Sequence, residues 1–313
     1  MNVVLVTSRE PGAGKTALAS ALALRLAYEG RKVLALRLGG GDGDGSAEHD
    51  AAFYAEQPYA RGRGGRPLPS VEEARRAAGD AAVLFLEAPA GADPAALLPA
   101  EGAVVLCVRW SPEFSAEAVK AQAGVPAESL LGVAVIAVPA KLLGEVRARL
   151  IHAGLPVLAA LPEDRTLYAP RLSEVVEALD AEVLLGEVDG DPVIENVQIN
   201  PISADPGYRY FRQKGAKAVI TRSDKTDLQL AALKTDTDCL ILTGGLPPSP
   251  YTLDHAASNE TVLLLTQGDT NATVRHLEDI YGRTRFGSER KLERMAELLG
   301  EHADLAVLAR LAG

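Results

Sequence analysis

Residues 3–16 decide the fold, and they read Val3-Val4-Leu5-Val6-Thr7-Ser8-Arg9-Glu10-Pro11-Gly12-Ala13-Gly14-Lys15-Thr16. An apolar run ends at a turn containing glycine. The turn leads into a helical pattern in which Leu18, Leu22 and Leu26 recur at four-residue spacing. Gly30 stands where a helix commonly ends, and a second apolar run follows it. Strand, glycine loop, helix and strand in this order predict a phosphate-binding βαβ unit.

The turn also carries the chemistry needed to hold a nucleoside triphosphate. Consecutive backbone N–H groups and a helix N-terminus attract an anion, a lysine neutralises its charge, and a hydroxyl ligates Mg²⁺. Lys15 is predicted to reach the β- and γ-phosphates, and Thr16 to ligate the metal. ATP, or another NTP, and Mg²⁺ are therefore the predicted cofactors. The predicted binding residues are Pro11, Gly12, Ala13, Gly14, Lys15, Thr16 and Ala17.

The match to the full phosphate-loop pattern has one departure. That pattern places glycine six residues before the lysine, where this sequence has Arg9. The strand before the turn and the helix after it favour nucleotide binding over the alternative, a chance Gly-Lys-Thr at an ordinary helix start.

A phosphate loop usually works with an acidic residue at the end of a neighbouring buried strand. Glu87 closes the apolar run Val83-Leu84-Phe85-Leu86, so we predict that Glu87 acts with Thr16 at the metal. The alternative is an exposed glutamate at a strand end. Glu10, within the loop, either faces the metal or a substrate, or lies on the surface.

Apolar runs alternate with helical patterns along the chain, which indicates parallel sheets covered by helices. The first series of runs is 3–6, 33–38, 82–86, 104–108, 133–138 and 157–159. The second series is 183–185, 193–199, 218–220, 239–243 and 261–265. The fold class predicted is α/β: a parallel sheet of the P-loop NTPase type with helices on both faces, over residues 1–163, followed by a smaller α/β domain over residues 164–313.

Composition excludes several classes of function. A formal charge of −10 argues against a chain-wide surface that follows nucleic-acid phosphates. No apolar run reaches the roughly 20 residues of a membrane span, so we predict a cytoplasmic protein with neither a membrane nor a nucleic-acid partner. Cys107 and Cys239 lie in apolar runs and are predicted to be small buried hydrophobes. The five histidines lack partners at the spacing of metal ligands.

Two loops interrupt the first series of runs. Residues 39–45 are rich in glycine, and residues 61–67 contain Arg61, Arg63 and Arg66. We expect both loops near the carboxyl ends of the strands, where doubly wound sheets bind ligands. They are either solvated loops, or a cover whose arginines close over an anionic ligand.

The first half resembles the dethiobiotin synthetase branch of P-loop proteins, through the loop 7–16, Arg37 after the second strand, and Glu87 in Glu87-Ala88-Pro89-Ala90-Gly91. It is more closely similar to the domain at the N-terminus of long phosphotransacetylases. Three departures from the synthetases put biotin-pathway chemistry and the usual adenine contacts in doubt. Arg37-Leu38 replaces a Lys-Pro pair, the turn after Glu87 is altered, and Ile136-Ala137-Val138-Pro139 lacks an expected asparagine.

The second half resembles the DRTGG domain that follows in those phosphotransacetylases. The naming residues match Asp224 and Lys225, with lysine in place of arginine, and Thr243-Gly244-Gly245. These five residues are a candidate second ligand site, in which backbone N–H groups face an anion. The alternative is a pair of tight turns. Asp269, with Thr270, is read as the N-cap of a helix that extends through Tyr281.

We therefore predict an ATP-binding regulatory or sensor protein whose phosphate-loop domain reports nucleotide state to the DRTGG domain. The alternative is an ATP-dependent ligase or ATPase that phosphorylates a small carboxylate or carbamate. For that enzyme the catalytic candidates are Lys15, Arg37 and Glu87. The residues that would clamp its acidic substrate are Arg37, Arg61, Arg63 and Arg66. The 313 residues leave no room for an acetyltransferase domain, so no acetyl transfer is expected from them alone. The resemblance also implies a homo-oligomer.

Overall fold

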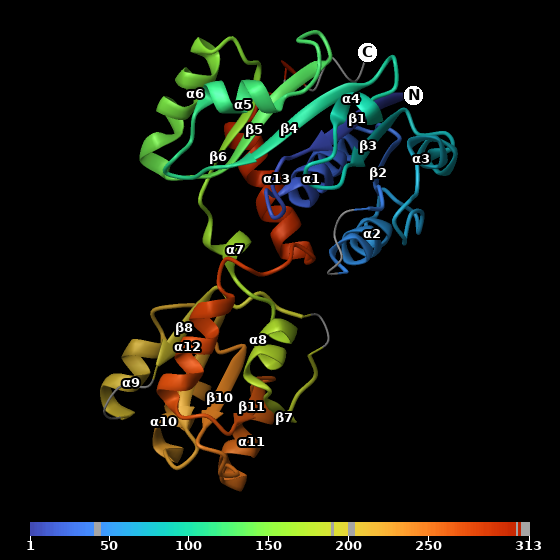
Figure 1. The fold of residues 1–313 in the computed structure, drawn as a ribbon. Coiled ribbons are helices and arrows are strands. Elements are labelled where there is room, and N and C mark those ends of the chain that lie inside the picture. The colour runs from blue at the N-terminus through green and yellow to red at the C-terminus, as the bar shows by residue number, and fades with distance from the viewer. Residues whose placement is uncertain (41–44, 189–190, 200–203, 305, 308–313) are drawn as a thin grey trace. The chain divides into compact units, whose positions relative to one another are not determined.

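The chain forms two compact units in a computed structural model that describes residues 1–313 except 41–44, 189–190, 200–203, 305 and 308–313 (Figure 1). The first unit comprises Met1–Asp164 together with Lys291–Gly313, and the second comprises Arg165–Arg290. Each unit has its own sheet.

A six-stranded parallel sheet is the centre of the first unit, in the order β2-β3-β1-β4-β5-β6. Its strands are β1 (Asn2–Thr7), β2 (Val33–Arg37), β3 (Val83–Glu87), β4 (Ala103–Arg109), β5 (Leu130–Val138) and β6 (Val157–Pro162). After β1 the chain builds one side of the sheet and then crosses to the other. The loop that follows β1 therefore lies at the point where strand order reverses, which is where such sheets bind ligands.

Helices cover both faces of this sheet. They are α1 (Lys15–Tyr28), α2 (Ser46–Glu56), α3 (Val71–Ala78), α4 (Pro94–Leu97), α5 (Ala116–Gln122), a 3₁₀ turn η1 (Ala140–Leu142), α6 (Leu143–His152) and α13 (Glu289–His302). One core cluster joins Val3 and Leu5 of β1 to residues of α3, α5 and α6. Helix α1 packs on the other face. The predicted α/β fold of this unit, a parallel sheet with helices on both faces, is confirmed.

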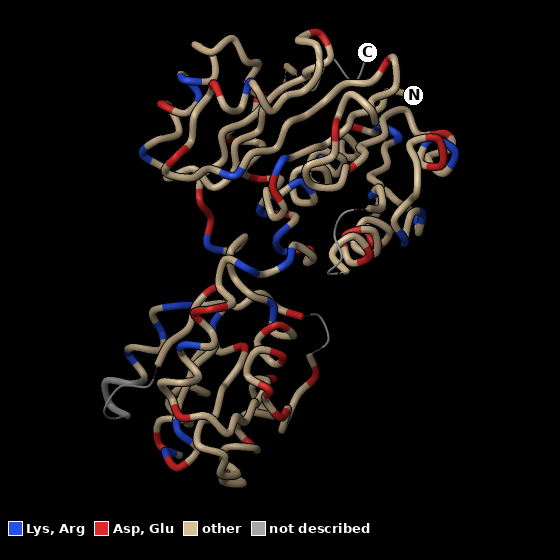
Figure 2. The backbone as a smooth tube through the Cα atoms, viewed as in Figure 1, with Lys and Arg blue, Asp and Glu red and all other residues tan. Residues whose placement is uncertain are grey.

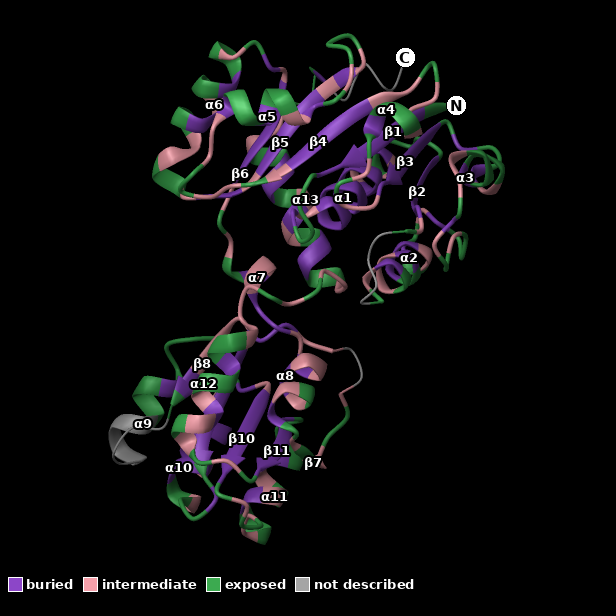
Figure 3. Cartoon of the chain, in the orientation of Figure 1, coloured by how far each residue is buried: buried purple, intermediate pink, exposed green. Residues whose placement is uncertain are grey.

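The strands are buried because both faces of the sheet are covered, as Figure 3 shows. All five residues of β2 and of β3 are buried. On α1, Leu18, Leu22 and Leu26 are buried as their spacing predicts. The helix ends before Gly30. Gly30 has φ +80°, and its N–H donates to the Ala27 carbonyl. Each strand of this sheet overlaps its predicted apolar run, so periodicity located the first unit correctly.

The second unit has a five-stranded mixed sheet in the order β7-β11-β10-β9-β8, in which only β7 is antiparallel to its neighbour. Its strands are β7 (Glu182–Leu185), β8 (Asn196–Ile199), β9 (Lys217–Arg222), β10 (Cys239–Thr243) and β11 (Val262–Thr266). Its helices are α7 (Arg165–Tyr168), α8 (Leu172–Leu179), α9 (Ala204–Phe211), α10 (Thr226–Leu233), α11 (Pro250–Ser258) and α12 (Thr270–Ile280).

The C-terminal helix α13 belongs to the first unit, although the sequence boundary assigned all of 164–313 to the second domain. The Asp304 N–H donates to the Leu158 carbonyl at 2.8 Å, and Arg147 donates to the His302 carbonyl at 2.7 Å. The Arg294 Nε also lies 2.7 Å from Asp164 Oδ2. The assignment of this segment was wrong because its amphipathic pattern shows one buried face and does not specify which core that face contacts.

Charge is spread through both units, with Lys and Arg interspersed among Asp and Glu along each (Figure 2). Within the part of the chain that the structure describes, no helix has both the length and the apolar character to cross a membrane.

Candidate functional site

Two glycines give the loop between β1 and α1 its path. Gly12 has φ +67° and Gly14 has φ +89°, a region that L side chains rarely adopt. A Cβ added to Gly14 would lie 2.9 Å from Ile136 Cδ1, which is closer than real Cβ contacts. Glycine is thus favoured at position 14 by the backbone conformation, and the Cδ1 end of the Ile136 side chain would have to shift to admit a Cβ.

The carbonyl groups of this loop accept hydrogen bonds from neighbouring side chains. Cys107 Sγ donates to the Ala13 carbonyl at 2.9 Å, and Arg109 Nη1 donates to the Gly12 carbonyl at 3.2 Å. Among the described residues, the N–H groups of Gly12 and Gly14 have no hydrogen-bond acceptor. They stand beside the first turn of α1, whose N–H groups and helix dipole favour an anion. The loop therefore combines occupied acceptors with available donors.

Lys15, Thr16 and Glu87 converge at the carboxyl end of β3. Thr16 Oγ1 donates to Glu87 Oε1 at 3.3 Å, and Lys15 Nζ lies 3.9 Å from the same oxygen. Lys15 Nζ also donates to Ser8 Oγ at 3.1 Å. All three predicted side chains are buried. The structure thus brings together an ammonium group, a hydroxyl and a carboxylate beneath the loop.

Three further side chains surround the Glu87 carboxylate. The Tyr54 hydroxyl donates to Oε2 at 2.6 Å, and Arg37 Nε lies 3.6 Å from Oε1. Arg37 Nε is also 3.6 Å from Asp50 Oδ2. Burial, and then the charge of Asp50, raise the pKa of Glu87 above its usual range, against the lowering effects of Arg37 and Lys15.

The Tyr54 hydroxyl is a fixed donor in this cluster. Burial, followed by the neighbouring charge of Glu87, raises the pKa of Tyr54 well above its ordinary value. The phenol therefore keeps its proton and donates a hydrogen bond to the carboxylate.

Sequence reasoning missed Asp50 and Tyr54, which both come from α2. The signal available was their spacing, because residues four apart on a helix share a face. What the spacing does not give is the partner, since α2 reaches Glu87 only through the tertiary fold.

Arg37 is a buried cation between two carboxylates, not an open clamp for substrate. Its side chain is 1% exposed, and Nη1 donates to the Leu38 carbonyl at 2.6 Å. With Asp50 and Glu87 beside its Nε, its charge is already balanced inside the protein. The idea that Arg37 clamps an acidic substrate is therefore wrong.

One part of the arginine loop lies at the expected edge, where Leu68, directly after it, donates its N–H to the Arg37 carbonyl at 2.9 Å, and another part does not. Arg63 Nη1 donates to the Ala78 carbonyl at 3.1 Å and lies 3.4 Å from Asp80 Oδ1. Asp80 precedes β3, so Arg63 lies at the amino end of that strand, opposite the phosphate loop. Arg61 and Arg66 are exposed. Of the glycine-rich loop, residues 41–44 lie outside the described residues.

A cavity of about 200 Å³ adjoins the phosphate loop on the side of β4 and α5. Its lining includes Arg9, Glu10 and Ala13 from the loop, Arg109 from the end of β4, and Phe114 from the segment after β4. Glu10 is exposed and faces this cavity rather than the Glu87 cluster. The cavity can hold only a small ligand.

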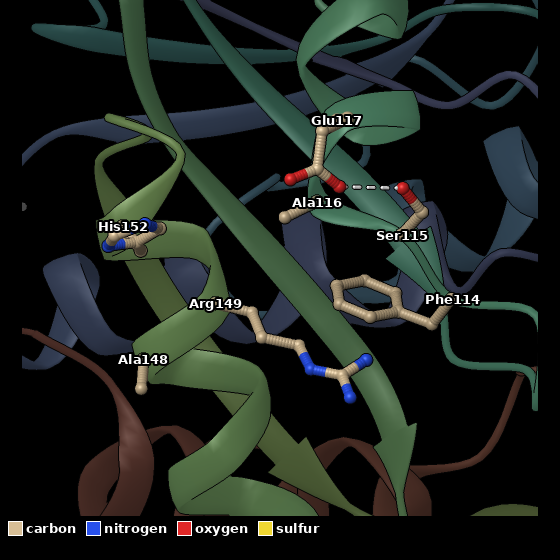
Figure 4. A pocket seen from close by; sticks show the side chains of 7 residues that line it. All are labelled: Phe114, Ser115, Ala116, Glu117, Ala148, Arg149 and His152. Carbon is tan, nitrogen blue, oxygen red and sulfur yellow. Dashed lines mark hydrogen bonds between the residues drawn. The ribbon is translucent and has the colours of Figure 1, made fainter.

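A separate hollow of about 530 Å³ lies between the start of α5 and helix α6 (Figure 4). Ser115 Oγ donates to Glu117 Oε2 at 2.9 Å on one side, and Arg149 and His152 lie on the other. No residue of the phosphate loop lines it, so its larger volume does not make it the site of the loop's chemistry.

In the second unit, the residues that name the DRTGG domain form tight turns. The Gly244 N–H donates to the Gly268 carbonyl at 2.9 Å, and the Gly245 N–H donates to the Thr266 carbonyl at 3.1 Å. These groups are therefore not available to an anion, contrary to the proposed ligand site. Thr243, before them, bonds to Thr270 through its hydroxyl at 3.0 Å.

The acidic half of that second candidate site is also occupied within the unit. Asp224 pairs with Arg222 at 2.6 Å on the surface, and Lys225 is exposed at the start of α10. The structure therefore favours the alternative, in which these residues form a pair of tight turns. The predicted cap is confirmed, since Asp269 Oδ1 accepts from the Ala272 N–H at 2.8 Å.

Comparison with known proteins finds a curated relative in the phosphate acetyltransferase of Nitratidesulfovibrio vulgaris Hildenborough. It is 28% identical over 158 residues, which are 47% of this chain and 22% of that protein. The match thus spans less than a quarter of the relative's length. The resemblance of the first unit to dethiobiotin synthetases stays a prediction.

Two solved structures show limited likeness. The CBS and DRTGG domains of the regulatory region of Clostridium perfringens pyrophosphatase, complexed with the activator diadenosine tetraphosphate, are 18% identical, with a TM-score of 0.34 over 40% of this chain and 56% of that one. The MinC:MinD cell division complex of Aquifex aeolicus is 18% identical, with a TM-score of 0.38 over 53% of this chain and 84% of that one. Both TM-scores lie below 0.5, so neither likeness supports a functional conclusion.

The firmest relationship concerns the second unit. Residues 174–280 match the family described as the DRTGG domain, and they lie entirely within Arg165–Arg290. The predicted domain is confirmed, over a shorter stretch than 164–313, and this chain contains a DRTGG domain in its second unit.

Proposed function

We propose that the first unit binds a nucleoside triphosphate, ATP or another NTP, with Mg²⁺. The single observation that carries the proposal is the convergence of Lys15, Thr16 and Glu87 beneath a loop whose glycine N–H groups are available. The ammonium group would neutralise the β- and γ-phosphates, while the N–H groups of residues 12–17 would hold the phosphate oxygens.

The residues present fit Mg²⁺ as the accompanying metal. The Thr16 hydroxyl and the Glu87 carboxylate are oxygen donors facing each other at 3.3 Å, and Mg²⁺ prefers one or two such groups together with phosphates and waters. Bound Mg²⁺ would supply positive charge to the phosphates. Thr16 would ligate it, and Glu87 would hold its water shell.

A regulatory role is the function we propose for this binding, with the first unit reporting nucleotide state to the DRTGG domain. The chain leaves the first unit at Asp164 and re-enters it at Lys291, so the second unit is inserted between β6 and α13. Arg294 of α13 pairs with Asp164 at 2.7 Å, which ties the two connections together inside the first unit. A change in the first unit would therefore reach both connections.

Titration calorimetry tests the binding. ATP and GTP are titrated into the whole chain with Mg²⁺ and with EDTA, using the wild type, Lys15→Ala and the control Lys225→Ala. We expect Mg²⁺-dependent binding that Lys15→Ala weakens by roughly 10- to 100-fold, since charged hydrogen bonds contribute about 1.5–3 kcal/mol. Lys225→Ala, on the second unit, should bind as the wild type does. Equal binding by Lys15→Ala would contradict the proposal.

Hydrogen exchange tests the regulatory part. Mg²⁺ and ATP should change exchange within residues 165–290 in the wild type and leave it unchanged in Lys15→Ala. Tight binding with no change there would leave nucleotide binding intact and remove the sensor role.

A second candidate is phosphoryl transfer to a small carboxylate or carbamate, which the cavity of about 200 Å³ beside the loop favours. Arg9 and Arg109 line this cavity and would pair with an acid, beside the acidic Glu10 and Glu113 of the same lining. Phosphate release measured against a panel of small carboxylates separates the two functions. Strong stimulation by one acid would support the enzyme, and unstimulated slow release would support the regulator.

We also propose, from the family resemblance, that identical chains associate in the cytoplasm. Sedimentation velocity with and without nucleotide measures this directly, and a monomer at all concentrations would contradict it.

A further inference from the structure

The two oxygens of the Glu87 carboxylate have different partners. Oε1 faces the predicted metal side, where Thr16 Oγ1 lies at 3.3 Å and Lys15 Nζ at 3.9 Å. Oε2 faces away from these groups and accepts the Tyr54 hydroxyl at 2.6 Å. Oε2 thus accepts the short hydrogen bond from α2, whereas Oε1 lies near the loop residues Thr16 and Lys15, with Arg37 Nε also 3.6 Å from it.

A fixed donor is needed to keep the two oxygens with these different partners, because the terminal torsion of glutamate has a broad, two-fold energy profile. Without a partner on Oε2, the carboxylate of Glu87 can rotate about that bond. Tyr54 is completely buried and cannot swing away from the contact, since its ring lies in the packed interior. The hydroxyl therefore selects one orientation of the carboxylate plane.

Helix α2 holds this donor through a second contact. Asp50, one turn before Tyr54, reaches Arg37 at 3.6 Å, and Arg37 in turn lies 3.6 Å from Glu87 Oε1. Phe53 and Ala51 of the same helix are buried as well. Phenylalanine would fill nearly the same volume as Tyr54, so packing alone does not account for the hydroxyl. The hydrogen bond to Glu87 does.

We propose that Tyr54 is a positioning residue that orients Glu87 toward the metal side of the phosphate loop before nucleotide binds. This inference rests on the proposed function of the loop. It adds that α2, which carries no residue of the phosphate-loop motif, sets the metal dependence of nucleotide binding. Oriented carboxylates of this kind typically owe a 10- to 100-fold gain in metal affinity to the groups that hold them.

The test compares Tyr54→Phe with Tyr59→Phe, a matched change of a tyrosine that packs against the core of the same unit. Two quantities are measured by calorimetry: the Mg²⁺ concentration that gives half-maximal ATP binding, and the ATP affinity in EDTA. For Tyr54→Phe we expect the required Mg²⁺ to rise roughly tenfold while the affinity in EDTA is unchanged. Tyr59→Phe should change neither. Circular dichroism and thermal unfolding verify that both variants are folded.

A double-mutant cycle asks whether Tyr54 acts through Glu87. In a Glu87→Gln background, Tyr54→Phe should add no further increase in the Mg²⁺ requirement. Four outcomes overturn the inference: an unchanged Mg²⁺ requirement in Tyr54→Phe, an equal loss of affinity with and without metal, an undiminished effect in the Glu87→Gln background, or an equal effect of Tyr59→Phe. Absence of Mg²⁺-dependent binding in the wild type would instead remove the proposed function, and this inference with it.

Discussion

The chain contains two glycine turns that each follow a buried parallel strand, and they are used differently. In the first unit, the N–H groups of Gly12 and Gly14 have no acceptor among the described residues, and a lysine, a threonine and a glutamate converge beside them. In the second unit, the N–H groups of Gly244 and Gly245 donate to backbone carbonyls. The first turn leaves its glycine N–H groups available, whereas the second closes its own sheet edge.

The difference shows that a glycine turn at the carboxyl edge of a sheet is not itself a binding site. Charge makes the same distinction. Lys15 is buried beside Glu87, while Asp224 is neutralised by Arg222 on the surface. The first turn thus differs from the second by its available N–H donors and by the buried, oriented charged groups beside it. Four measurements can sharpen or break that contrast.

The largest expected effect is that bound nucleotide raises the free energy of unfolding of the first unit and not that of the second. At a nucleotide concentration 100 times Kd, binding stabilises a folded unit by about 2.7 kcal/mol. Trp110 is the only tryptophan and lies in the first unit, so its fluorescence reports unfolding there. Mg²⁺ and ATP should move the Trp110 transition to higher urea, and a transition that does not move would contradict the contrast.

A smaller effect is expected from Glu87→Gln, compared with the same change at Glu10. Glu87 lies at 3.3 Å from Thr16 Oγ1, whereas Glu10 is exposed. Glu87→Gln should raise the Mg²⁺ needed for nucleotide binding by roughly tenfold or more, and Glu10→Gln should leave it unchanged. Mg²⁺ is titrated at fixed ATP to measure both requirements. A larger increase for Glu10→Gln than for Glu87→Gln would place the metal at the loop rather than at β3.

A matched pair of glycine substitutions comes next. Gly14→Ala and Gly245→Ala each force alanine into positive φ, at a cost of ~1–2 kcal/mol. Both should lower the free energy of unfolding in urea titrations of their own unit. Only Gly14→Ala should also weaken nucleotide binding, because its added Cβ would press the loop against Ile136. Loss of binding in Gly245→Ala would show that the two turns are not functionally separate.

The smallest effect concerns the ion pair that ties α13 to the end of β6. Arg294 and Asp164 are partly exposed, so Arg294→Gln should cost only about 0.5–1 kcal/mol in the free energy of unfolding of the first unit. Urea unfolding followed by Trp110 fluorescence measures it. The control is Arg290→Gln, which changes an exposed arginine in the first turn of α13 that lies outside the first unit and pairs with Glu195. A much larger loss would mean that α13 depends on this pair rather than on its buried Leu292, Met295 and Leu299.

Much of the fold was predictable because each unit repeats a local pattern. The apolar runs located the strands, and Leu18, Leu22 and Leu26 located the face of α1. The meeting of Thr16 with Glu87 followed from parallel topology, since β1 and β3 are neighbours whose carboxyl ends share an edge.

Contacts set by tertiary packing were not predictable in this way. Tyr54 reaches Glu87 from a helix outside the phosphate-loop motif, and α13 returns to the first unit after the whole second unit. Arg37 appeared available because its position at the end of β2 matches that of the lysine in the Lys-Pro pair of dethiobiotin synthetases. The carboxylates that enclose it are distant in sequence. Residue type and strand-end position do not reveal whether a charge is already balanced.

The most direct test of the central claim is a crystal structure of the whole chain with Mg²⁺ and a non-hydrolysable ATP analogue. The account predicts the β- and γ-phosphates on the N–H groups of residues 12–16, with Lys15 on the phosphates and Mg²⁺ between Thr16 and the Glu87 side. Phosphates bound elsewhere, or a loop that stays empty at saturating analogue, would contradict it.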